Sequence, residues 1–255
     1  MDDSFERVLD WKPVFDKRSK QFPVSAILPL EQELKYTLWK TGAILDQGNE
    51  GACVGFGWTA EALAGPVQVD LKKIKTADVP HDPTKFAHFV YKNAQKIDQW
   101  PGEAYSGTSV LAGAKVLMQV GILHEYRWAF SVDDIIGTLM SHGPVVLGVN
   151  WYQGMYRAPD GKLEIFGNKV GGHCILAVGY NPSSSKFNGK QTIFLQNSWG
   201  LDWGINGIAE MTVEDLNRLV NEGGEACVPL VRGIHQDPKA LATQQECCGN
   251  GCCSR

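Results

Sequence analysis

The sequence predicts an α+β fold in which a mainly helical first half and a mainly β second half enclose a cleft. Up to about residue 140, apolar residues recur mostly at helical spacing, whereas later short β-prone runs are separated by Gly, Pro, Asn and Ser. A chain of 255 residues has room for one domain or for two closely packed subdomains. Chemistry is expected where the two halves meet, because ligands bind preferentially in clefts between packed units.

The composition is that of an ordered globular protein and argues against several kinds of partner. Hydrophobic residues make up 44% of the chain and charged residues 20%, and the formal net charge is −4. The chain therefore lacks the basic surface of a nucleic-acid-binding protein and the polybasic patch of a membrane-surface protein. The first residues do not form a secretory signal, and no apolar run is long enough to span a membrane. We expect a cytoplasmic protein.

Residues 1–30 are interpreted as an extended N-terminal arm, because they contain several prolines and show no clean hydrophobic period. The aromatic residues Trp11, Phe15 and Phe22 are expected to pack the arm against the body. The alternative is an inhibitory segment, and an arm this short can block a cleft only by lying directly in it.

The first half is expected to contain one edge strand and several helices. Residues 31–45 alternate in part, as an edge strand does, and residues 66–83 are interpreted as a surface loop. Periodicity and capping residues predict helices at Thr84–Asp98, at Val110–Val120 and after the capping box formed by Ser131 and Asp134.

The second half is expected to be a set of strands followed by a short helix. Four β-prone runs lie between turn residues, at 145–149, 174–180, 192–195 and 207–211. The helix is predicted at Val213–Asn221, where Thr212 and Asp215 form a capping box.

A glycine-rich loop leads into an apolar segment that begins with Cys53. If this segment is a helix, Cys53 lies at its N-terminus, where free N–H groups and the helix dipole stabilise a nucleophilic thiolate. Periodicity favours a strand instead, because Val54, Phe56 and Trp58 alternate, and two glycines weaken the helix prediction.

A nucleophilic cysteine needs a base, a group that orients the base, and hydrogen-bond donors for the developing oxyanion. His173 stands at the entry of a predicted buried strand, after two glycines that permit close approach from the opposite half. Asn197 supplies an amide at the exit of the next strand, and the indole of Trp199 follows it, where it can shield the pair from water.

Three blocks in this order resemble the papain-like cysteine peptidases of bacterial or phage type. Gln47-Gly48…Gly51-Ala52-Cys53 resembles the oxyanion glutamine and nucleophile of that family. Gly172-His173 and the strand after it resemble the histidine strand, and Asn197-Ser198-Trp199-Gly200 resembles the asparagine motif. The resemblance covers about residues 35–212, and the parts of the family's sequence that have no counterpart in it are the secretory signal and the long pro-segment.

The resemblance implies a papain-like two-lobed fold with an active-site cleft. A mainly helical lobe at about 46–140 and an antiparallel, β-barrel-like lobe at about 141–235 would form a catalytic domain within residues 31–240. It implies a thiol-dependent hydrolase that cleaves peptide or protein substrates through an acyl-enzyme intermediate, without a cofactor or a metal ion.

Roles for individual residues follow from the same resemblance. Cys53 and His173 would form a thiolate–imidazolium pair that Asn197 orients, completing a Cys-His-Asn triad. The Gln47 side chain and the Cys53 N–H would form the oxyanion hole, and Trp199 would cover the bond between His173 and Asn197.

Substrate-binding positions are expected at Gly107, Thr108, Gly172 and Trp199. Gly172 replaces the acidic residue common before the histidine, and Val54 replaces the aromatic residue that commonly follows the nucleophile.

Two other functions stay open. The chain could be a non-catalytic binding or structural component of a larger assembly, such as a phage particle, with the same fold. The third possibility is metal binding by the tail at residues 241–255, which we otherwise expect to be flexible and which contains four of the seven cysteines: Cys247, Cys248, Cys252 and Cys253.

Overall fold

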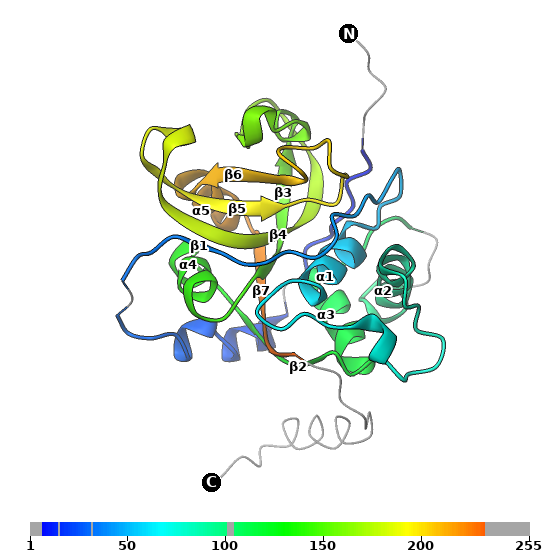
Figure 1. The fold of residues 1–255 in the computed structure, drawn as a ribbon. Helices are drawn as coiled ribbons and strands as arrows, with labels where there is room; N and C mark the ends of the chain where they lie inside the picture. The colour runs from blue at the N-terminus through cyan, green and yellow to red at the C-terminus, as the bar shows by residue number, and fades with distance from the viewer. Residues whose placement is uncertain (1–6, 15, 32, 101–104, 233–255) are drawn as a thin grey trace.

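Three helices form at the predicted places in the first half of the chain. The computed structural model describes residues 7–14, 16–31, 33–100 and 105–232. The helices are α1 (Cys53–Ala62), α2 (Pro83–Ile97) and α3 (Val110–Gln119), and they pack together on one side of the molecule (Figure 1). Asp82 and Ser109 begin the last two, since their side chains accept N–H groups of the first turn.

The segment that follows Cys53 is a helix that is buried on all sides. Every residue of α1 is buried, so its sequence has no polar face from which a helical period could be read. Its two glycines are packing positions. A Cβ at Gly55 would lie 2.8 Å from Tyr91 Cβ of α2, and one at Gly57 would lie 2.7 Å from Cys174 Sγ. The residues that weaken helix propensity therefore let α1 approach its neighbours closely.

One antiparallel sheet makes up most of the second half. Its order is β2 (Leu123–Trp128), β7 (Glu225–Arg232), β3 (Val145–Tyr152), β4 (Lys169–Ser184), β5 (Lys190–Gln196) and β6 (Ile208–Thr212). Strands β3, β4 and β5 contain three of the predicted runs, and β6 includes all of the fourth except Gly207. Register shifts interrupt the pairing of the long β4 with β3 and with β5, and such irregularities bend a strand.

Two strands and the extent of a third differ from the sequence prediction. The sequence analysis missed β2 and β7, and the edge strand expected within residues 31–45 is the short β1 (Thr37–Leu38), which pairs with β4. Pro229 lies inside β7, where it pairs with Tyr126 of β2. A proline within an apolar run argues against a strand, which explains why the pattern was not recognised.

The sheet is the common wall of two hydrophobic cores. One face packs with α1, α2 and α3, and the other packs with α4 (Val132–Ser141) and α5 (Val213–Asn221). Helix α4 lies before the boundary expected near residue 140, and its apolar residues belong to the same core as those of α5.

The N-terminal arm is partly helical and only partly packed as expected. Short 3-10 helices form at Lys17–Gln21 and Val24–Ala26. Trp11 is buried as predicted, but Phe22 is 45% exposed because its backbone pairs with Trp128 while Val24 enters the core instead. Phe15 and the cysteine-rich tail lie outside the described residues.

Candidate active site

Cys53 is the first residue of α1 and is completely buried. The loop before it is fixed to the strand-rich lobe, because the Gln47 N–H donates to the Ser198 carbonyl at 2.9 Å. Hydrogen bonding by the backbone N–H of Cys174, the residue after His173, reaches the Cys53 thiol. The helix start and the histidine strand therefore meet at the sulfur.

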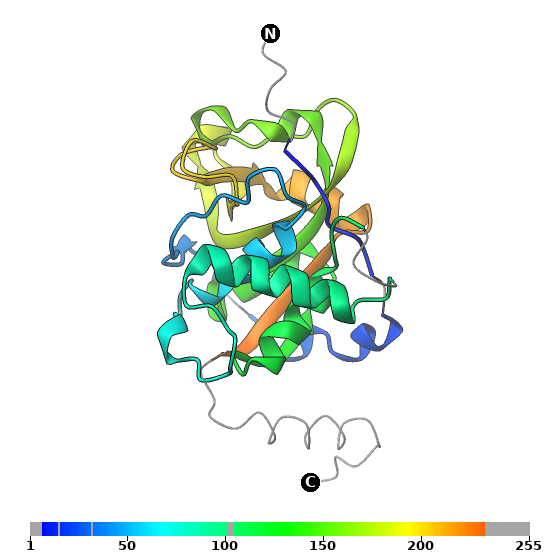
Figure 2. The same cartoon turned by 90° about the vertical axis from the view of Figure 1, so that its right-hand side faces the viewer.

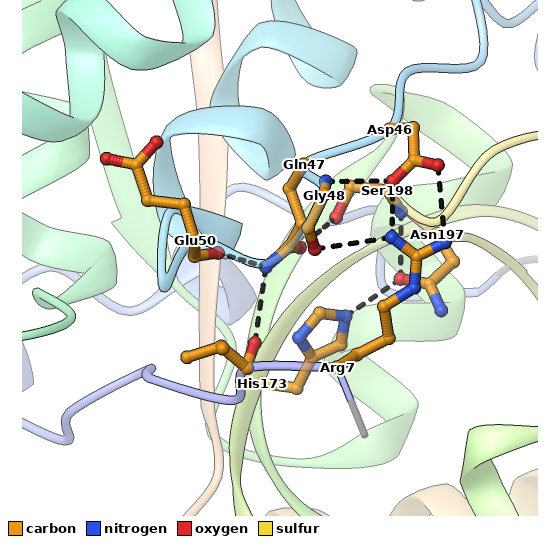
Figure 3. A network of polar contacts seen from close by, with 9 residues as sticks. Arg7, Asp46, Gln47, Gly48, Glu50, His173, Asn197 and Ser198 are labelled. Carbon is orange, nitrogen blue, oxygen red and sulfur yellow. Dashed lines mark hydrogen bonds and ion pairs between the residues drawn. The ribbon is translucent and has the colours of Figure 1, made fainter. Parts of the chain in front are cut away.

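His173 lies on β4 and is held by Asn197, which follows β5. Its Nε2 and Asn197 Oδ1 are 2.8 Å apart, and Oδ1 also accepts the Ser198 N–H at 2.8 Å (Figure 3). This contact fixes the plane of the imidazole ring. The other ring nitrogen, Nδ1, is buried without a hydrogen-bond partner among the described residues, so it is free to exchange a proton with a group in the cleft.

Two indoles enclose this pair. The ring of Trp199 lies 4.8 Å from the His173 ring, as the sequence analysis expected of a residue that shields it. Trp151 of β3 was not anticipated, and its ring lies 4.6 Å from the imidazole at an angle of 66°. Both indoles are buried, so water is excluded from the side of the histidine that faces the sheet.

The amide of Gln47 is held in one orientation by Ser198. Ser198 Oγ donates to Gln47 Oε1 at 2.7 Å, which leaves the nitrogen Nε2 to serve as the donor. Nε2 donates to the Glu50 carbonyl at 2.9 Å (Figure 3). It also donates to the Val8 carbonyl, on the arm, at 3.3 Å. The amide expected to receive a substrate oxyanion is therefore in contact with a carbonyl of the chain itself.

The arm occupies the cleft between the lobes. The Trp11 N–H donates to the Gly172 carbonyl at 2.9 Å, and the Lys12 N–H donates to the Thr108 carbonyl at 3.0 Å. Gly107 has a φ of 86° and packs directly against the Asp10 carbonyl. Figure 2 shows the arm, in dark blue, crossing from the strand-rich end of the view to the helical end. Three of the four expected substrate-binding positions, Gly107, Thr108 and Gly172, therefore bind residues of the arm.

Burial favours the neutral forms of both the thiol and the imidazole in the covered site. Burial raises the pKa of the Cys53 thiol to about 11, although hydrogen bonding by the N–H groups of Cys174 and Asp10 opposes the shift. Burial likewise lowers the pKa of His173 to about 4, against the effect of the Asn197 hydrogen bond. The thiolate–imidazolium pair implied by the family resemblance is thus disfavoured while the arm lies over it.

The residues singled out from the sequence come together in one place. His173, Asn197 and Trp199 contact one another, and the N–H that follows His173 reaches the Cys53 thiol. Gln47, Gly107, Thr108 and Gly172 contact the arm. Sequence reasoning missed two contributors, Ser198 and Trp151. Ser198 lies within the recognised asparagine motif, whereas nothing in the local pattern distinguishes Trp151.

Neither metal binding nor membrane insertion finds support in the part of the chain that the structure describes. No cluster of three histidine, cysteine or carboxylate side chains there is arranged to hold a metal ion. No described helix combines the length and apolarity needed to cross a bilayer.

Comparison with protein families gives one match. The family model described as papain family cysteine protease matches residues 87–224. The matched segment contains His173 and Asn197, and Cys53 lies before it.

Curated relatives are similar at low identity. A peptidase C1-like protein of Acanthamoeba polyphaga mimivirus, described as uncharacterized, is 24% identical over 214 residues, which are 66% of this chain and 63% of the relative. Cathepsin B-like cysteine proteinase 4 of Caenorhabditis elegans is 31% identical over 83 residues, which are 32% of this chain and 24% of the relative. The chain thus covers less than two thirds of the length of these relatives.

Solved structures share the fold. Xylellain, a cysteine protease from Xylella fastidiosa, matches with a TM-score of 0.58 and 19% identity over 88% of this chain and 96% of its own. Procathepsin L 3 of Tenebrio molitor matches with a TM-score of 0.54 and 14% identity, over 88% of this chain and 84% of its own. At such identities the matches concern the fold alone, and they confirm the papain-like architecture expected from the sequence.

Proposed function

Because the chain belongs to the papain family of cysteine proteases, we propose that it is a cysteine endopeptidase that hydrolyses peptide bonds through an acyl intermediate on Cys53. The observation that carries this function is that three segments far apart in the sequence meet around Cys53 and His173. Cys53 begins α1, the N–H after His173 reaches its thiol, and Asn197 holds the ring of His173 at 2.8 Å.

The reaction follows from these groups. The Cys53 thiolate attacks the scissile carbonyl carbon, a C–S bond forms, and the oxyanion accepts hydrogen bonds from Gln47 Nε2 and the Cys53 N–H. Protonated His173 gives its proton to the leaving amine as the C–N bond breaks. Water, deprotonated by His173, then attacks the thioester, releasing the acid product and regenerating the thiolate. Asn197 keeps the imidazole in the orientation that both proton transfers need.

The conformation with the arm in the cleft corresponds to a latent enzyme. The Val8 carbonyl occupies the donor of Gln47, and the Trp11 and Lys12 N–H groups occupy the carbonyls on either side of the cleft. A substrate can bind only after these contacts break. With the arm displaced, water reaches the thiol and the imidazole, and the burial that favours their neutral forms is relieved.

A non-catalytic binding or structural role is the second candidate, because the covered thiol has a raised pKa. Full-length chains with Trp11→Ala, alone and together with Cys53→Ala, separate the two. We expect Trp11→Ala to increase the rate at which iodoacetamide alkylates Cys53, as measured by mass spectrometry. We also expect the Trp11→Ala chain to cleave casein, and this cleavage to be lost when Cys53→Ala is added. Fast alkylation without any cleavage would reject the peptidase function and leave the binding role.

A further inference from the structure

The amide of Gln47 has two N–H groups, and groups of the chain itself set their directions. One donates to the Glu50 carbonyl at 2.9 Å, and the other reaches the Val8 carbonyl of the arm at 3.3 Å. On the other side of the amide, Oε1 accepts the Ser198 hydroxyl at 2.7 Å. Because the amide is planar, the contacts with Ser198 and Glu50 leave one N–H directed into the cleft. The position of the Glu50 carbonyl therefore determines where this donor points.

The main chain does little to hold Glu50 in place. Glu50 lies in a loop between Gly48, which has a φ of 61°, and Gly51. Among the described residues, no hydrogen bond joins the main chain of Glu50 to another main-chain group. A loop of this kind depends on side-chain contacts for a fixed shape.

Part of that support comes from the arm. Arg7 pairs with Asp46 at 2.7 Å and donates to the Gly48 carbonyl at 3.2 Å. These contacts break when the arm leaves the cleft, as the proposed reaction requires. Figure 3 shows that the Glu50 side chain extends away from the Gln47 amide and from His173. Its carboxylate contacts the body of the protein instead of the arm.

His88 of α2 holds this carboxylate. The His88 Nδ1 lies 2.8 Å from Glu50 Oε2. The imidazole also packs edge-on against Phe56, with the ring centres 5.2 Å apart and the ring planes at 88°. Phe56 is completely buried and lies about one turn after Cys53 on α1. One side chain of α2 thus contacts both the loop that precedes Cys53 and the first turn that follows it.

Helix α2 is firmly packed at this place. A Cβ at Gly55 would overlap the Ala87 carbonyl, so α1 and α2 are in backbone contact beside His88. The ion pair itself is partly exposed, because 33% of the His88 side chain and 43% of the Glu50 side chain are accessible. Since pairs this exposed contribute little to stability, loss of the pair should change the loop and leave the fold intact.

We propose that His88 is a positioning residue for the oxyanion donor. It holds Glu50, and the Glu50 carbonyl engages one N–H of Gln47 so that the other points into the cleft. The role in hydrolysis rests on the proposed peptidase function, because that reaction forms the oxyanion. The effect on the Gln47 amide does not require turnover.

The first test follows the Gln47 amide in the otherwise unaltered full-length chain. Its NMR signals are those that Gln47→Ala removes, and the readout is the rate at which its N–H groups exchange hydrogen with solvent. His88→Phe keeps a ring against Phe56 but removes the donor, so exchange should become roughly three- to tenfold faster. His88→Asn places an amide N–H near the position of Nδ1, so exchange should stay within about twofold of the parent rate.

The second test measures turnover in the chain opened by Trp11→Ala, with casein as the substrate. Adding His88→Phe should lower kcat roughly three- to tenfold and leave KM within about twofold, because a misdirected donor weakens an interaction made in the transition state. Adding His88→Asn should recover at least about half of kcat. Alkylation of Cys53 by iodoacetamide forms no oxyanion, so its rate should stay within about twofold. A role confined to holding α1 in place would change alkylation and kcat together.

Two further variants serve as controls. Arg127→Ala removes an ion pair of similar exposure, to Glu125 at 2.9 Å on β2, and both amide exchange and kcat should stay within about twofold. Glu50→Ala should lower kcat as His88→Phe does, and the chain with both changes should be no slower than Glu50→Ala alone, because the two residues act as one unit.

The outcomes separate this role from the peptidase function. Amide exchange that His88→Phe leaves unchanged would overturn the proposal, and so would a normal kcat in His88→Phe combined with a low kcat in His88→Asn. Faster exchange with an unchanged kcat would overturn the role in hydrolysis. If the Trp11→Ala chain cleaves nothing while exchange responds as expected, the peptidase function is rejected and the action of His88 on the amide is supported.

Discussion

Gly148→Ala should open the proposed active site without changing the sequence of the arm or any of the proposed catalytic residues. The added Cβ would overlap Nε1 of Trp11, so the indole must move and lose its hydrogen bond to Glu225. That bond to a carboxylate contributes about 1.5–3 kcal/mol, and overpacking a filled site typically costs about 1–3 kcal/mol. A loss of about 3 kcal/mol from the covered state raises the open fraction roughly a hundredfold.

Alkylation of Cys53 by iodoacetamide, measured by mass spectrometry of the full-length chain, follows the open fraction directly. The matched control is Val149→Ala on the same strand, whose buried side chain belongs to the core on the other face of the sheet. This control destabilises the fold without touching the arm. Equal acceleration of alkylation in the two variants would show that labelling reports global unfolding, and the idea that Trp11 holds the arm in place would be refuted.

Three further outcomes are expected, the first two in a chain opened by Gly148→Ala. Ser198→Ala removes the 2.7 Å hydrogen bond that orients the Gln47 amide, so kcat should fall about tenfold with little change in KM. Ser198→Thr should restore part of kcat. An unchanged kcat would mean that the Glu50 carbonyl alone orients the amide. Asn197→Ala removes the 2.8 Å contact to His173 and should lower kcat roughly ten- to a hundredfold. Asn197→Gln should recover little activity, because the longer side chain displaces the amide oxygen. Equal kcat in all three chains would show that Asn197 does not orient His173. Folding raises the pKa of Glu225 from its ordinary value of 4.5 to about 7, so the folded chain binds more protons than the unfolded chain between these pH values, and its stability falls as pH rises from 4.5 to 7. In thermal unfolding of the otherwise unaltered chain, Glu225→Gln should reduce the loss of Tm between pH 4.5 and 7. Identical pH profiles of Tm for the two chains would contradict the raised pKa.

The helical half shows what patterns can and cannot reveal. Helix α2 has one buried and one exposed face, and the sequence predicted it to within a residue at each end. Helix α1 has no exposed face, so its apolar residues carry no helical period, and only the family resemblance predicted a helix from Cys53. Burial on every side removes the contrast on which periodicity depends.

The residues proposed to be catalytic could be singled out because they lie in short, glycine-rich blocks whose order is distinctive. Glu225 could not be singled out in this way. It is a single carboxylate at the start of β7, a strand that the sequence pattern does not reveal because it contains Pro229, and its partner Trp11 lies 214 positions earlier in the chain. The arm posed a different problem. Trp11 was correctly expected to be buried, but a sequence does not indicate which surface an aromatic residue will cover.

The arm and the cleft are parts of one polypeptide, and this connection determines when the site is guarded. Translation produces Val8, Trp11 and Lys12 before either Thr108 or Gly172, the residues to which the arm binds. Each copy that completes its histidine strand therefore already carries the segment that covers it, at the high effective concentration that tethering provides. No separate inhibitor has to find the newly made chain by diffusion, and dilution of the protein does not by itself release the segment.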